Sequence, residues 1–232
     1  MELGEILLAR SEKRLETVSR NVSNVSTPGF KREIPFADII AGASGGERAG
    51  GPAEGYTDFA QGALQLTGAP LDLAISGKGF FRVTAGDQVL YVRGGQFSRR
   101  EDGRVATSQG LMLQTASGED LVLDAANFEI LGDGVVLQGG APVARIGVFG
   151  PPDGQNLVSI GGGAFSDPSG VAGEVGAPVV RQGMLEASNV EMAKEMVTMM
   201  EALRQGESGA RLIQLYDSLI GQSVSTFGQM TK

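Results

Sequence analysis

Apolar residues recur every three or four positions at both ends of the chain, and this spacing constrains the fold more than any other feature. The N-terminal stripe consists of Leu8, Ser11, Leu15, Val18, Val22 and Val25. Such spacing is typical of an amphipathic helix with a coiled-coil seam. Pro28 and Gly29 end the predicted helix, because Pro disfavours helical conformation in the preceding residue and Gly admits a positive φ.

The C-terminal segment predicts a longer helix, which begins at Ser188 or Asn189 because both are favourable N-cap residues. Its main stripe consists of Met192, Met196, Met199, Leu203, Gly206, Ala210, Ile213, Asp217, Ile220, Val224 and Phe227. A second stripe beside it consists of Val190, Val197, Met200, Leu212, Leu215 and Leu219. Two stripes make a wide apolar face, which needs more than one neighbour to bury it.

These patterns predict that the terminal helices pair with each other as an antiparallel coiled coil and then pack against other copies. The Met residues suit such a surface, since Met adapts to neighbours of different shape. The side chains expected at the assembly interface are Leu8, Leu15, Val18, Val22, Val25, Met192, Met196, Met199, Leu203, Ile213, Ile220, Val224 and Phe227.

Short apolar runs bounded by Gly, Asp and Ser fill the middle of the chain and predict strands. The runs are residues 71–75, 80–83, 89–92, 105–107, 111–113, 121–123, 135–137 and 143–148. The 36 Gly residues of the chain fit many tight turns between short strands. We therefore expect an α+β protein whose central antiparallel β domain is a sandwich or a small barrel.

Composition divides the chain into four segments. Residues 1–36 form the predicted N-terminal helix and turn, and residues 37–55 form a connector rich in Gly and Ala. Residues 56–183 form the β domain, and residues 184–232 form the C-terminal helix. The two helical segments together are expected to make a helical assembly domain.

The chain contains no His, Cys or Trp, which excludes whole classes of site. A Ser-His-Asp triad, His- or thiolate-bound zinc, an iron–sulfur cluster and a disulfide each need His or Cys. The net charge of −8 argues against nucleic acid as a partner, and no apolar run is long enough for direct membrane insertion. We expect no cofactor, no metal and no enzymatic activity.

Some residues could nevertheless support chemistry. Residues 42–46 fit the G-x-S-x-G pattern and residues 76–79 contain the Gly-Lys pair of a phosphate loop, but both lack the flanking elements that these motifs need. Carboxylates at the turns could act as a glycosidase pair. A secreted carbohydrate-binding or carboxylate-based glycan-active protein is therefore the alternative from another class. A peptide-binding chaperone with a Met-rich groove is a third interpretation.

Four blocks of sequence resemble the bacterial flagellar basal-body rod and hook family. They are residues 21–32, 59–81, 93–107 and 183–217, in the same order as in the family. The motif residues within them are Asn21, Asn24, Thr27, Gly29, Phe30, Lys31, Leu71, Asp72, Ile75, Gly77, Gly79, Phe80, Ser188, Asn189 and Val190. Gly206 stands where the family usually has Tyr.

The resemblance implies a structural subunit that assembles with other rod subunits into a torque-transmitting drive shaft. It also implies the flagellar type III export apparatus as a partner, export without a cleaved signal peptide, and a place in the rod within the periplasm. The length and the single β domain are most similar to the proximal-rod members of the family. A distal-rod or hook-type member is the alternative.

Overall fold

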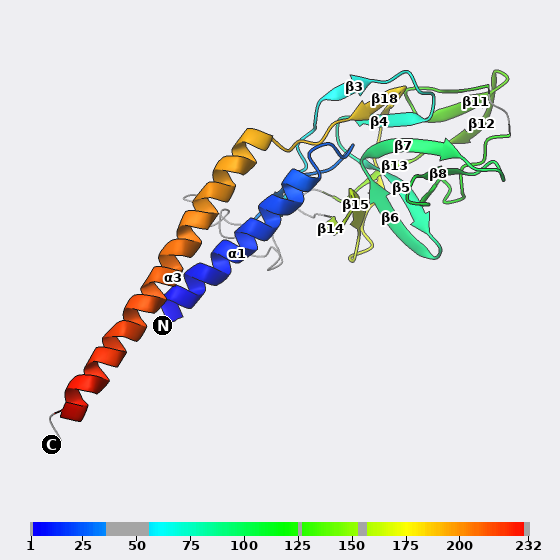
Figure 1. The fold of residues 1–232 in the computed structure, drawn as a ribbon. Coiled ribbons are helices and arrows are strands. Elements are labelled where there is room, and N and C mark those ends of the chain that lie inside the picture. Colours follow the sequence, from blue (N-terminus) through cyan, green and yellow to red (C-terminus); the bar gives the residue numbers. More distant parts are fainter. Residues whose placement is uncertain (1, 36–55, 125–126, 153–156, 230–232) are drawn as a thin grey trace. The chain divides into compact units, whose positions relative to one another are not determined.

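The computed structural model describes residues 2–35, 56–124, 127–152 and 157–229, without the side chains of residues 2–3 and 222–229. The chain divides into two compact units, and each contains segments from both ends of the chain. The helical unit comprises residues 1–23, 33–58 and 190–232, and the β unit comprises residues 24–32 and 59–189. Figure 1 shows their elements.

Within its described residues, the helical unit contains two long helices and a small sheet. Helix α1 spans Glu2–Ser23 and helix α3 spans Met192–Gln229, and the two pack side by side (Figure 1). Strands β1 (Glu33–Ile34) and β2 (Tyr56–Thr57) pair antiparallel, with Glu33 opposite Thr57. Among the described residues, neither helix has a stretch apolar and long enough to span a membrane.

The β unit is built from short strands, and every pairing between them is antiparallel. Their bounds are β3 Leu64–Leu66, β4 Asp72–Ser76, β5 Phe80–Ala85, β6 Gln88–Val92, β7 Gly94–Arg99, β8 Val105–Thr107, β9 Met112–Leu113, β10 Phe128–Ile130, β11 Val135–Gln138, β12 Ala141–Arg145, β13 Val148–Gly150, β14 Val158–Gly161, β15 Ala164–Ser166, β16 Gly173–Glu174, β17 Val179–Gln182 and β18 Met184–Glu186.

The largest sheet has the strand order β14-β15-β6-β5-β9-β8-β7-β4-β17, and β13 joins it by pairing with β5 and with β16. Strands β10, β11 and β12 form a three-stranded sheet. Strand β18 pairs with β3, with Leu185 opposite Gln65, so the segment before α3 is part of the β unit. The fold is therefore α+β with an antiparallel β unit, as the sequence predicts.

Apolar residues of the central strands form a large core in the β unit, and strand β4 is buried along nearly its whole length. Leu73, Phe81, Leu113 and Ile146 are fully buried in it. Tight turns need glycine at particular points: Gly79 has φ +115°, and a Cβ there would lie 2.4 Å from Val148 Cγ1. Gly79 therefore lets β5 approach β13 closely.

Three sequence expectations differ from the structure or fall outside it. Helix α3 begins at Met192 rather than Ser188 or Asn189, because the Asn189 side chain bonds the backbone of Arg32 and Ala60 instead of capping a helix. Residues 121–123 are no strand, although Leu121 and Leu123 are buried. The connector, residues 37–55, and the motif-like residues 42–46 lie outside the described residues.

Candidate assembly interface

The contact between α1 and α3 is built from small residues. A methyl group at Gly4 would lie 2.7 Å from Ile213 Cγ1, and one at Gly206 would lie 2.9 Å from Ser11 Oγ. A Cβ at Gly209 would lie 3.2 Å from the carbonyl oxygen of Gly4. These pairings show that the helices run antiparallel. At Gly209 a side chain would meet the backbone of α1 and push the two helices apart, so glycine allows their close approach.

Polar side chains extend this contact. Arg14 Nη2 donates to Glu201 Oε2 at 3.0 Å near the middle of the pair. Toward the end of α1, Asn21 Nδ2 donates to Glu195 Oε2 at 3.1 Å, and both side chains are fully buried. Asn21 also bonds both the backbone N–H and the C=O of Glu33, at 2.9 and 2.8 Å. Asn21, a motif residue, therefore fixes β1 to the two helices.

The predicted stripe on α1 faces this contact. Ser11 and Val18 are buried, and Leu8, Leu15 and Val22 are half-buried. Val25 is also half-buried but belongs to the β unit rather than to the helix.

The stripe of α3 that faces α1 differs from the predicted stripe. Its buried and half-buried members include Glu195, Met199, Ala202, Gly206, Gly209 and Ile213. Of the main predicted stripe, Met199, Gly206 and Ile213 are on this face. The predicted residues Met192, Met196, Leu203 and Ile220 are exposed. The side chains of Val224 and Phe227 lie outside the described residues.

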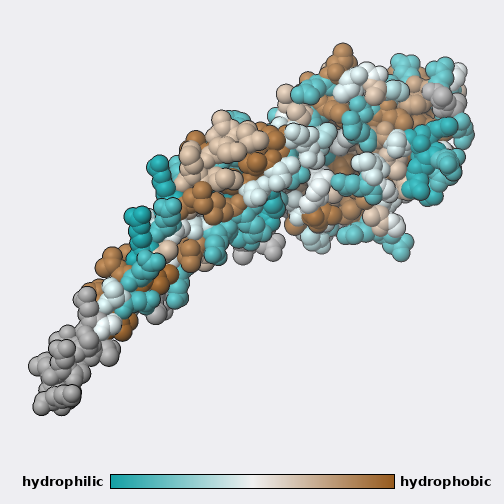
Figure 2. Space-filling view, viewed as in Figure 1, coloured by the Kyte–Doolittle hydropathy of each residue, from teal (hydrophilic) through white to brown (hydrophobic). Residues whose placement is uncertain are grey.

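The large apolar side chains of α3 therefore remain on its surface. The exposed ones are Met192, Met196, Val197, Met200, Leu203, Leu212, Leu215, Tyr216, Leu219 and Ile220. Figure 2 shows brown, apolar surface over the two helices. Met200 and Leu215 are 53% and 58% exposed, so the free chain leaves much of its apolar helical surface in water. An exposed apolar surface of this kind is typical of an interaction site.

A buried ionic network joins the N-terminal turn of the β unit, residues 24–32, to strand β18. Glu186 is fully buried, and its Oε1 accepts from Lys31 Nζ at 2.5 Å and from the N–H of Gly62 at 2.9 Å. Its Oε2 accepts from Arg93 Nε at 2.7 Å. Arg93 also donates to the carbonyl oxygens of Gly77 and Gly79. The carboxylate thus joins the N-terminal turn, the central sheet and strand β18.

The N-terminal turn of the β unit contains most of the first motif. The Thr27 hydroxyl donates to Asn24 Oδ1 at 3.1 Å and closes the turn. Gly29 has φ +70°, and its N–H donates to the carbonyl oxygen of Glu186 at 2.7 Å. Phe30 is buried. These residues fold the turn onto β18, which places Lys31 beside Glu186.

The remaining motif residues have structural roles in one unit or the other. Asp72 Oδ2 accepts from the Thr67 hydroxyl at 2.6 Å, and the carbonyl oxygen of Ile75 accepts from Gln61 Nε2 at 2.8 Å. Phe80 packs against Phe165 with ring centroids 5.4 Å apart. Leu71 is half-buried against the core, Ser188 is half-buried beside Asn189, and Val190 is buried in the helical unit.

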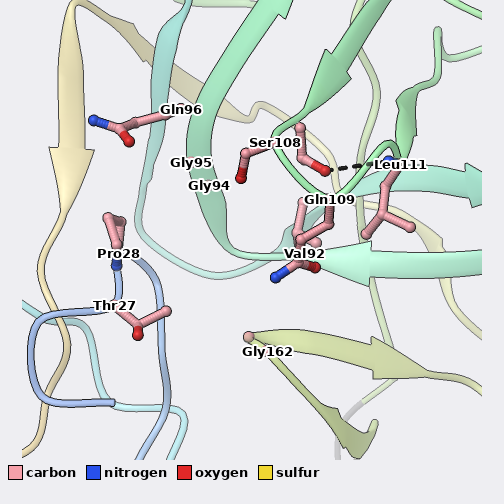
Figure 3. Close-up of a pocket in the computed structure, with 12 residues that line it drawn as sticks. Thr27, Pro28, Val92, Gly94, Gly95, Gln96, Ser108, Gln109, Leu111 and Gly162 are labelled. Atoms are coloured by element: carbon pink, nitrogen blue, oxygen red, sulfur yellow. Dashed lines mark hydrogen bonds between the residues drawn. The ribbon is translucent and has the colours of Figure 1, made fainter. Parts of the chain in front are cut away.

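A cavity of about 110 Å³ lies in the β unit between the N-terminal turn and strands β6 and β7 (Figure 3). It is lined by Thr27, Pro28, Val92, Gly94, Gly95, Gln96, Thr107, Ser108, Gln109, Leu111, Gly162 and Gly163. These side chains are neutral, so the cavity offers hydrogen bonds but no acid, base or cation. Within the described ranges, no three Asp or Glu side chains lie together as a metal site.

Two of the turn carboxylates share one cation. Arg104 forms ion pairs with Asp102 at 2.7 Å and with Asp120 at 3.3 Å. Hydrogen bonds from Arg104 lower the pKa of Asp102 below its usual value. A glycosidase acid needs a raised pKa, so this pair does not favour the glycan-active alternative.

Sequence reasoning missed the ionic network and the Asn21–Glu195 pair. Lys31, Arg93 and Glu186 are far apart in the sequence, and a charged residue is ordinarily expected on the surface. No local pattern marks either charge as buried, because the residues beside Lys31 and Glu186 in the sequence carry no information on partners far along the chain.

Comparison with known proteins assigns the family. Residues 74–138 match the domain described as "Flagellar hook protein FlgE/F/G D1 domain", and residues 181–226 match "Flagellar basal body rod FlgEFG protein C-terminal". The chain is 30% identical to the flagellar basal-body rod protein FlgG of Bacillus subtilis, over 92% of this chain and 93% of that protein. It is also 30% identical to the FlgF proteins of Caulobacter vibrioides, over 94% and 93%, and of Mesorhizobium japonicum, over 94% and 92%. The chain therefore belongs to the flagellar basal-body rod protein family.

Proposed function

We propose that this chain is a non-enzymatic structural subunit of the bacterial flagellar basal-body rod. Its relatives are named as rod proteins, and its motif residues form buried structural contacts rather than an open site with paired acid and base groups. The observation that carries the proposal is the exposed apolar surface of α3. At about 25 cal/mol per Å², burial of that surface against neighbouring subunits stabilises an assembly.

In this proposal α1 and α3 pair as an antiparallel coiled coil that forms the assembly domain, and the β unit makes further contacts with neighbours. The small residues Gly4, Ser11, Gly206 and Gly209 support close pairing, because they let the two backbones approach. The large residues of α3 stay available for other rod subunits. Continuous contacts of this kind would make a stiff shaft that transmits torque.

We assign the chain to the proximal rod as a FlgF-like subunit. The alignments to the FlgF of Caulobacter vibrioides and the FlgG of Bacillus subtilis cover 94% and 92% of this chain. The first runs over 235 positions and the second over 249, so FlgF needs fewer insertions. A distal-rod, FlgG-like subunit is the alternative. In either case the proposal includes export by the flagellar type III apparatus and a place in the periplasmic part of the rod.

The test is complementation in the source bacterium after deletion of its own gene for this chain. The double variant Leu15→Asp with Val22→Asp places two charges at half-buried positions of α1, where an unpaired charge is strongly unfavourable. We expect this variant to be absent from isolated basal bodies and the cells not to swim. The matched control is Val143→Asp on the exposed face of β12, which should restore swimming. Swimming by the double variant would contradict assembly through the helices.

A further inference from the structure

Sulfur is distributed unevenly over the exposed apolar surface of α3. In the N-terminal half of the helix, the large apolar residues on this surface are Met192, Met196, Val197, Met200 and Leu203. In the C-terminal half, those on the described surface are Leu212, Leu215, Tyr216, Leu219 and Ile220. The surface therefore has a part rich in thioether groups, followed along the chain by a part without sulfur.

The three exposed Met side chains share one face of the helix. Met192, Met196 and Met200 follow one another at intervals of four residues, which is close to one helical turn, so their side chains lie one above the other. They are 40%, 44% and 53% exposed. Met199, in contrast, is half-buried on the side of α3 that contacts α1. We call Met192, Met196 and Met200 the Met row.

The Met row is the part of the described chain most open to oxidation. The sequence contains no Cys, Trp or His, so Met is its most readily oxidised residue type. Two other described Met residues, Met112 and Met184, are half-buried in the β unit. A small oxidant in the surrounding water therefore reaches the sulfur atoms of the Met row before those of the other described Met residues.

We propose that the Met row is an oxidation site, at which hydrogen peroxide converts an apolar surface into a polar one. Each thioether sulfur loses two electrons and takes one oxygen atom of the peroxide to become a sulfoxide, and the other oxygen leaves as water. The change is reversible, because a methionine sulfoxide reductase restores the thioether while a dithiol is oxidised to a disulfide and water is released.

Oxidation of the Met row would oppose assembly. The sulfoxide oxygen accepts hydrogen bonds, so its burial against an apolar neighbour that offers no donor is unfavourable. This inference rests on the proposed role of the exposed α3 surface as the assembly interface. The chain would be sensitive to peroxide before it enters the rod, and burial against neighbouring subunits would then shield the same sulfur atoms.

The first measurement compares oxidation rates in the purified, full-length chain. Dilute hydrogen peroxide is added, and tandem mass spectrometry follows the gain of one oxygen at each Met, which separates Met200 from its neighbour Met199. We expect the Met row to be oxidised several-fold faster than Met112 and Met184, because its sulfur atoms are in contact with water. In isolated basal bodies treated in the same way, the Met row should be protected.

Two triple variants test the consequence for assembly in cells that lack their own gene for this chain. The Leu variant, Met192→Leu with Met196→Leu and Met200→Leu, keeps an apolar surface of similar volume without sulfur. The Gln variant, with Gln at the same three positions, imitates the polarity of the sulfoxide. We expect the Leu variant to enter basal bodies like the unchanged chain and the Gln variant to be largely absent from them.

Peroxide treatment during flagellar growth links the two measurements. At a sublethal dose, the Leu variant should be incorporated into new basal bodies several-fold better than the unchanged chain. The matched control is Met112→Leu with Met184→Leu, which removes two sulfur atoms outside the Met row and should remain as sensitive as the unchanged chain. Circular dichroism checks that the Gln variant keeps its helix content, and if it does not, the peroxide comparison decides.

The inference would be overturned by equal oxidation rates at the Met row, Met112 and Met184 in the free chain. It would also be overturned by a Gln variant that enters basal bodies as well as the Leu variant does, or by a Leu variant that is as sensitive to peroxide as the unchanged chain. In each of these cases the rod assignment would stand. Absence of the unchanged chain from basal bodies without peroxide would instead remove the proposed function, and the effect of oxidation on assembly with it.

Discussion

At the scale of single residues, Glu186 connects three segments of the β unit that are far apart in the sequence. Its carboxylate holds Lys31, Arg93 and the N–H of Gly62 in a site with almost no access to water. A buried ion pair adds little net stability when it is complete, but removal of one partner leaves the other charge buried and unpaired. The stability of the β unit therefore depends on both its N-terminal turn and strand β18.

We expect Glu186→Gln to lower the free energy of unfolding of the β unit by about 3–5 kcal/mol, because two buried cations would lose their carboxylate. The matched control is Glu174→Gln, which removes a half-exposed carboxylate from its 2.5 Å ion pair with Arg145. An ion pair exposed to this degree contributes little to stability, because water screens the two charges. Chemical denaturation followed by tyrosine fluorescence measures both, and equal losses would contradict the structural role of the network.

None of this network could be predicted from the sequence in advance. The resemblance identified Lys31 as a motif residue, but spacing along the chain gives no information on a partner at position 186. Local patterns predict which face of an element is buried, whereas a buried ion pair depends on the tertiary arrangement of several segments. Asn21 illustrates the same limit, since its partners Glu33 and Glu195 belong to different elements.

At the scale of elements, the close approach of α1 and α3 depends on glycine. A Cβ at Gly209 would lie 3.2–3.3 Å from Gly4 O, Leu7 Cβ and Leu8 N, and two of these are backbone atoms that cannot move away alone. In contrast, no described heavy atom lies within 4 Å of a Cβ built at Gly221, farther along the same helix.

Gly209→Leu should therefore destabilise the helical unit by about 1–3 kcal/mol or more, because the larger side chain forces the two backbones apart. Gly221→Leu should be neutral or slightly stabilising, since it replaces glycine by a better helix former without a clash. Thermal melting followed at 222 nm by circular dichroism compares the two. A Gly209→Leu variant that melts like the unchanged chain would contradict close packing of the helices.

The elements themselves were largely predictable, and the errors have physical causes. The helix spacing at both ends and the Gly-bounded apolar runs predicted α1, α3, β4, β5, β6, β8 and β11. Strand β7 was missed because Phe97 is its one buried apolar residue. Apolar spacing could not show which stripe of α3 contacts α1, because such spacing selects large residues while the helices pack through small ones.

At the scale of the whole molecule, each unit draws on both ends of the chain. The β unit contains the N-terminal turn, residues 24–32, and the segment that leads to α3, while the helical unit contains α1, β1, β2 and α3. Helix α3 continues to Gln229, far past Ile213, which lies against Gly4 near the start of α1. Its C-terminal part thus has much exposed apolar surface and few described contacts with other elements. An isolated helix of about 12–15 residues is only marginally stable in water.

The central claim is that the apolar surface of α3 serves other subunits rather than this chain. Amide hydrogen exchange tests it by comparing residues 214–221 with the interior of β4 and β5, first in the free chain and then in isolated basal bodies. We predict fast exchange at residues 214–221 and slow exchange in the two strands of the free chain, because α3 opens locally without neighbours. In basal bodies residues 214–221 should become protected. Equal protection of these residues and the strands in the free monomer would contradict the account.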